Sequence, residues 1–219
     1  MTERTERSEG HEGTAKKGTA MADRAREVLG VAVRDPSWFR PLDPRVYLAA
    51  GARTPQPLRV PTGDAQLILH QTIREVAGLP RDASPEVVLT AGRSELLVHT
   101  RGVGLACAPG LVTMGLPVGC DQLPNGGSVQ VPFAVGTEDA PTGLVMAAYS
   151  RPSGPGVVVD AWAEALTAFA WSALVHLAQS LCAAAGTDAT RRPLVPGYLS
   201  AGHDVLIVQP MAGHRPPGR

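Results

Sequence analysis

The residue types best suited to chemistry stand around Cys120 and Asp121. Cys120 follows Gly119 at the end of a strand-like run and precedes a loop of Pro, Asn and Gly, where a nucleophile could be exposed. A thiol there would need a base, which His99 or His203 could provide. No sequence spacing links these residues, so the competing interpretation is a packed cysteine beside a turn-capping aspartate. Cys120, Asp121 and His99 are the candidate catalytic residues, and the catalytic set stays unknown.

Metal and cofactor sites are not indicated by the remaining cysteines and histidines. The three cysteines form no CxxC pair, and the histidines show no HxH, HExxH or HxxxH spacing. Cys107 and Cys182 lie in apolar stretches, where cysteine acts as a small hydrophobic residue. The glycines of Arg101 to Gly104 resemble a dinucleotide loop, but no helix follows to bind a pyrophosphate. We therefore predict no metal and no cofactor.

The composition indicates one domain in a reducing compartment. A chain of 219 residues can bury a sizeable core without metal or disulfide staples. An odd number of cysteines argues against a secreted disulfide framework and predicts a cytoplasmic protein. Lys16 and Lys17 are the only lysines, and the excess of arginine, alanine and glycine is typical of a GC-rich genome such as an actinobacterial one.

The net charge of zero disfavours nucleic acid and anionic membranes as partners, because the long-range attraction to phosphate is missing. A nucleic-acid-binding regulator remains an alternative function, and it requires the arginines of the N-terminal quarter to gather on one surface. These arginines are Arg24, Arg26, Arg34, Arg40, Arg45, Arg53 and Arg59.

The expected domain organisation is an arm, a domain and a short tail. Residues 1–20 mix both charge signs with Gly, Ser and Thr and have no apolar run, so they predict a disordered arm and neither a signal peptide nor an anchor. Translation could begin at Met1 or at Met21. Residues 21–210 are expected to form a single α+β domain, and residues 211–219 a frayed tail.

Hydrophobic periodicity predicts an antiparallel sheet of about five to six strands with a long C-terminal helix packed across one face. Short β-prone runs separated by turn residues fill the stretch from Glu86 to Ser150, with too little chain between them for crossover helices. A further strand is expected at residues 205–208. One or two shorter N-terminal helices are expected, at residues 22–33 and 64–78.

The long helix is expected at residues 161–185, with Asp160 as its N-cap and Gly186 after its last turn. Its principal apolar stripe, which includes Leu166, Phe169 and Leu177, should pack on the sheet. This leaves Trp171 and Val175 on a second face among polar residues. An exposed tryptophan favours a protein contact, so Trp171 and Val175 are the predicted interface residues. The helix is long enough to span a bilayer, but Glu164, His176 and Gln179 disfavour a membrane.

These patterns favour a non-enzymatic interaction or regulatory protein of the cytosol that acts as a homo-oligomer or with a protein partner. The alternative is a small cofactor-independent enzyme or a ligand-binding protein, whose pocket for a small molecule would lie between the sheet and the long helix. Convergence of Cys120, Asp121 and His99 in a concave pocket would favour the alternative, whereas scatter would favour the interaction protein.

Overall fold

A computed structural model describes residues 56–76, 86–91, 93–144, 148–188 and 191–213. The predicted arm, the helix expected at residues 22–33 and residues 214–219 lie outside these ranges. The chain forms an α+β fold with two antiparallel sheets, one long helix and one shorter helix. The predicted fold class is therefore confirmed.

The five-stranded sheet occupies the stretch in which the sequence predicted strands. Its strands are β2 (Glu86–Ala91), β3 (Ser94–His99), β4 (Gly104–Ala108), β5 (Gly110–Cys120) and β6 (Leu123–Gly136). β5 lies at the centre of this sheet: β6 pairs with one of its sides, and β4 and β3 share the other side. β2 continues the sheet beyond β3. The strands alternate between buried and more exposed residues, as a sheet with one face on the core requires.

The four-stranded sheet corrects the prediction for the C-terminal strand. It contains β1 (Leu58–Pro61), β7 (Thr142–Gly143), β8 (Leu194–Gly202) and β9 (Val205–Ala212), in the order β1-β9-β8-β7. β9 covers residues 205–208, which were expected in the first sheet. It pairs instead with β8, across a tight turn in which Asp204 adopts a φ of 54°. β9 also continues to Ala212, two residues into the predicted tail.

Both described helices begin earlier than the sequence predicted. α4 spans Gly156–Ala185 and has Pro155 at its N-cap, so Asp160 does not cap it. The Asp160 carboxylate instead accepts a hydrogen bond of 2.7 Å from Arg151. Gly186 ends α4 at a φ of 94°, as expected. α3 spans Thr62–Val76 and packs against α4.

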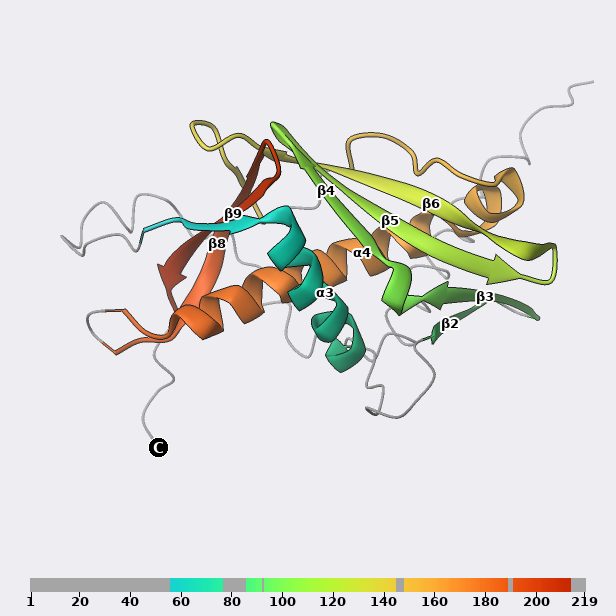
Figure 1. The fold of residues 1–219 in the computed structure, drawn as a ribbon, viewed down its shortest axis with the longest axis horizontal. Coiled ribbons are helices and arrows are strands. Elements are labelled where there is room, and N and C mark those ends of the chain that lie inside the picture. The colour runs from blue at the N-terminus through green and yellow to red at the C-terminus, as the bar shows by residue number, and fades with distance from the viewer. Residues whose placement is uncertain (1–55, 77–85, 92, 145–147, 189–190, 214–219) are drawn as a thin grey trace, which may run out of the picture.

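α4 runs along the molecule behind the other elements and contacts both sheets (Figure 1). Its 30 residues give a length of about 45 Å at 1.5 Å per residue, enough to pass both sheets. Every residue from 165 to 182 is buried or half-buried. Within the part of the chain that the structure describes, α4 is the one helix long and apolar enough to cross a membrane. Burial of half of its most apolar stretch is what a core helix of a globular domain would also show.

Polar side chains of α3 cover the free edge of β4. His70 Nε2 donates a hydrogen bond of 2.7 Å to the Val103 carbonyl, just before β4 begins. The Leu105 amide donates to Gln66 Oε1 over 3.3 Å. The Cys107 carbonyl accepts from the amide of Asp204 over 3.2 Å. These contacts block pairing of β4 with another strand and join α3 and the second sheet to the first.

Replacing Gln66 with leucine should lower the free energy of unfolding by about 1–2 kcal/mol, because the Leu105 amide loses its partner while remaining partly buried. Urea unfolding followed by circular dichroism measures this loss. Leu67→Ala is the matched control, since Leu67 is 70% exposed on the same helix and should change stability by less than about 0.5 kcal/mol. Equal effects of the two variants would show that the Gln66 contact does not stabilise the fold.

Candidate functional site

The structure separates Cys120 from His99. Cys120 is the last residue of β5 and packs against the hydrophobic core, on the same face of the strand as the buried Val118. His99 lies on β3, on the opposite face of the sheet, where its Nε2 stands over Gly119. Its Nδ1 lies 3.2 Å from Glu86 Oε1 on β2. Because the sheet backbone stands between the two side chains, His99 does not serve the Cys120 thiol as a base.

The other candidate polar residues lie on turns. Asp121 is exposed in the turn between β5 and β6, and His203 is exposed in the turn between β8 and β9. No group of three or more His, Cys, Asp or Glu side chains that could hold a metal occurs among the described residues. The arginines of the alternative nucleic-acid surface lie outside these residues, except Arg59, whose guanidinium pairs with Glu138.

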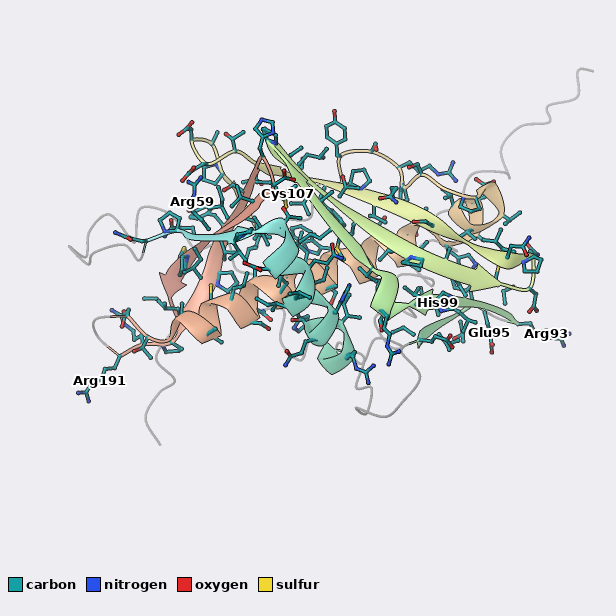
Figure 2. The ribbon with its side chains drawn as sticks, viewed as in Figure 1. Arg59, Arg93, Glu95, His99, Cys107 and Arg191 are labelled. Atoms are coloured by element: carbon teal, nitrogen blue, oxygen red, sulfur yellow. The ribbon has the colours of Figure 1, made fainter. Side chains whose placement is uncertain are left out.

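Cys107 and Cys182 occupy buried positions that disfavour a nucleophilic role. Burial raises the pKa of the Cys182 thiol to about 11. Burial also raises the pKa of the Cys107 thiol, and the neighbouring Thr62 hydroxyl only partly offsets this effect. Figure 2 shows Cys107 beside the start of α3. Since the thiolate is the reactive form, both cysteines act as packing residues.

The expected solvated face of α4 at Trp171 and Val175 is not present. Val175 is 6% exposed. Trp171 is half-buried, and its ring centroid lies 5.4 Å from that of Phe133 on β6. A helical wheel shows which residues share a face but not how many faces are covered, and α4 contacts α3 and both sheets. Trp171 and Val175 therefore offer little exposed surface, and their role in an interface stays a prediction.

Among the described residues, one side of the five-stranded sheet faces away from the core, and this side is here called the outer face. Its rows follow from the strand register: Ala106 lies beside Thr113, and Thr113 beside Pro132. The Gln130 side chain lies over Gly115, because a Cβ atom added to Gly115 would stand 3.2 Å from Gln130 Nε2. The outer face comprises Glu86, Val88, Thr90, Glu95, Leu97, His99, Gly104, Ala106, Ala108, Leu111, Thr113, Gly115, Pro117, Gly119, Ser128, Gln130, Pro132 and Ala134.

Charge is confined to one corner of the outer face. Its ionisable residues are Glu86, Glu95 and His99, all on β2 and β3, and Figure 2 labels Glu95 and His99. The outward positions of β4, β5 and β6 carry Gly, Ala, Pro, Leu, Thr, Ser and Gln only. Gly115 and Gly119 leave room for the Gln130 and His99 side chains to lie along the sheet. The result is a low, uncharged surface over three strands.

The sequence predicted these strands, but their outward positions were not among the predicted site residues. The sequence contains a signal for this face. Residues at both odd and even positions from Gly104 to Gly119 are apolar or small, whereas strands with one solvated face alternate apolar and polar residues. The chain matches no family model, no curated protein and no solved structure.

Proposed function

We propose that this chain is a non-enzymatic interaction or regulatory protein that acts through protein contacts, as a homo-oligomer or with a protein partner. The observation that carries this proposal is the uncharged outer face of β4, β5 and β6. A reducing, cytoplasmic setting is part of the proposal, and the free state of Cys107, Cys120 and Cys182 is consistent with it.

The size of the outer face supports a role in protein contacts. Strands about 4.8 Å apart and a rise of about 3.4 Å per residue give each outward residue about 33 Å², so the twelve outward positions of β4, β5 and β6 cover about 400 Å². A typical monomer has a largest apolar patch of about 300–600 Å², and patches of that size are often functional. Protein interfaces are also depleted in charged residues at their centres, as this face is.

The enzyme alternative gains no support from the candidate catalytic residues. Cys120 and His99 lie on opposite faces of the sheet, and Asp121 is exposed on a turn. The layer between the five-stranded sheet and α4 is filled by buried side chains such as Phe133, Leu116 and Leu166, where the pocket had been expected. A general base must lie within hydrogen-bond reach of the proton that it removes, and these groups do not meet that condition.

Photo-crosslinking in cells tests the proposal. A photoreactive phenylalanine analogue at Ala106, an exposed position of the outer face, should give one crosslinked product of discrete mass. The matched control is the same analogue at Ala161, an exposed position on α4, which should give no such product. Mass spectrometry identifies the captured protein, either this chain or one partner.

The captured product should disappear when Thr113→Arg is added, because an arginine at the centre of the face places a charge where a partner would have to desolvate it. The same pattern of products from both crosslinking positions, or a product unaffected by Thr113→Arg, would contradict a role of the outer face in protein contacts.

A further inference from the structure

We infer that residues 22–33 pack as a helix along the outer face of β4, β5 and β6 and cover it when no partner is bound. This inference rests on the proposed function, because it names the segment of the chain that regulates access to the same face. Residues 22–33 lie outside the described residues, and their sequence predicts a helix. The width of the face, the tether, the small side chains and the charges favour this segment.

The uncharged part of the outer face has the width of one helix. Neighbouring strands lie about 4.8 Å apart, so three strands extend over about 10 Å, and a helix is about 10 Å wide. Residues 22–33 would form a helix about 18 Å long. The row from Leu111 to Gly119 of β5 is about 27 Å long, so the helix fits on it.

The tether makes a small contact area sufficient. The uncharged positions cover about 400 Å², whereas each partner buries about 800 Å² in a stable interface between separate molecules. A tethered segment binds at an effective concentration of about 1 mM, so less contact area holds it in place. A face of this size therefore suits a segment of the same chain.

The connector is long enough to reach the face. Leu58, the first residue of β1, precedes Gln66 by eight residues, and Gln66 binds the Leu105 amide of β4. Leu58 therefore lies within about 40 Å of β4, since an extended chain spans at most about 3.6 Å per residue. Residues 34–57 can span about 80 Å by the same rule, which exceeds this distance.

The segment has a stripe of small apolar side chains that suits the low relief of the face. On a helical wheel the stripe consists of Ala25, Val28, Leu29 and Ala32. On the face, Gly104, Ala106 and Gly115 leave little relief, so a helix can lie close to the strands. An isolated helix of this length is marginal in water, and packing of its stripe on the face would stabilise it.

The arginines of the segment complement the acidic corner of the outer face. On the helical wheel Arg24 and Arg26 flank the apolar stripe, whereas Asp23 and Glu27 fall on the opposite side. Glu86 lies in the corner formed by β2 and β3, beside the C-terminal end of β5. Electrostatic attraction therefore favours a helix whose first turns lie at this corner.

The tether selects the same direction for the helix. With its first turns at the acidic corner, the helix ends near Leu111, which pairs with Ala108 of β4. The neighbouring Cys107 carbonyl accepts from the Asp204 amide over 3.2 Å, and the Asp204 carbonyl accepts from the Thr62 amide over 2.9 Å. Thr62 directly follows β1, so the connector leaves the helix at the end of β5 that lies beside β1.

Photo-crosslinking in the purified full chain tests the inference. A photoreactive phenylalanine analogue at Ala106 should crosslink to residues 22–33 of the same molecule, and peptide mapping by mass spectrometry locates the bond. Leu29→Glu should lower the yield at least about tenfold, because it places a carboxylate in the apolar stripe. Val31→Glu, the matched control, makes the same kind of change outside the stripe and should keep the yield.

Hydrogen exchange gives a readout that needs no photoreactive residue. The amides of residues 22–33 should exchange at least about tenfold more slowly in the wild type than in Thr113→Arg, because the arginine obstructs the centre of the face. Ala106→Arg, at an exposed position of the same face, replaces Thr113→Arg if that variant does not fold. Fast exchange in the wild type, or protection that neither arginine variant removes, would overturn the inference.

Partner capture in cells separates the inference from the proposed function. Leu29→Glu should raise the yield of the partner product at Ala106 at least about twofold, because the segment no longer competes for the face. A partner product without any crosslink to residues 22–33 would overturn the inference and leave the proposed function standing. A crosslink to residues 22–33 without a partner product, even in Leu29→Glu, would overturn the proposed function and leave the segment as a layer of the fold.

Discussion

Phe133→Ala is expected to lower the free energy of unfolding by about 3–5 kcal/mol, the usual cost of removing a buried aromatic ring. Phe133 is fully buried on β6 and is the largest side chain among those with less than 2% exposure. Its ring contacts Trp171 of α4 at an interplanar angle of 51°. The substitution leaves a cavity between the sheet and the long helix, where strands and helix cannot both move inward.

Equilibrium urea unfolding, followed by circular dichroism, measures this effect. Phe133→Leu conserves most of the volume and should cost less than about 1.5 kcal/mol. Tyr149→Ala removes a ring of similar size from a residue that is 67% exposed. The Tyr149 backbone amide, which donates to the Pro132 carbonyl, is kept, so the substitution should change stability by less than about 0.5 kcal/mol. A loss below about 1 kcal/mol for Phe133→Ala would mean that this layer does not hold the fold together.

The long helix and the strands of the first sheet were predictable because their periodicities are local properties. Leu166, Phe169 and Leu177 recur at helical spacing, and all three are buried as that stripe predicted. In the first sheet, turn residues separate runs that are too close together for helical crossovers. The start of α4 was misplaced because Asp160 has the side chain of an N-cap, whereas the helix begins directly after Pro155.

The second sheet could not be predicted, because it depends on pairing between distant segments. Residues 58–61 pair with residues 205–208, and nothing in either segment specifies the other. β8 contains Pro196 and Gly197, which break a strand pattern in the sequence. In the structure a register shift between Pro196 and Tyr198 accommodates them.

The candidate site could be predicted only in part, because the sequence shows which residues of a strand share a face but not which face lies on the core. Alternation along β3 places His99 on the face opposite to Leu96 and Val98, and alternation along β5 places Cys120 with Val118. Which of these parities faces the core becomes known only once the helices are placed. The burial of Val175 likewise depends on how many elements pack around α4, and a helical wheel does not show their number.

Gly136→Ala is expected to lower the free energy of unfolding by about 2–4 kcal/mol, through backbone strain and steric overlap together. Gly136 ends β6 at a φ of 74°, where the chain turns toward β7 and the second sheet. A Cβ atom there would overlap the Ala140 carbonyl oxygen and stand 2.7 Å from the Thr142 nitrogen. Both are backbone atoms, so no side-chain rotation relieves the overlap.

Two other glycines separate these causes. Gly110 has the same φ of 74°, but its nearest neighbour would be 3.6 Å from a Cβ atom, so Gly110→Ala should cost only the backbone term of about 1–2 kcal/mol. Gly63, in the first turn of α3, has nothing within 4 Å, and Gly63→Ala should stabilise the protein by up to about 1 kcal/mol. Thermal and urea unfolding of the three variants should rank them in this order. Equal losses for Gly110→Ala and Gly136→Ala would show that the turn from β6 to β7 relaxes around a methyl group, and that the two sheets are not rigidly joined there.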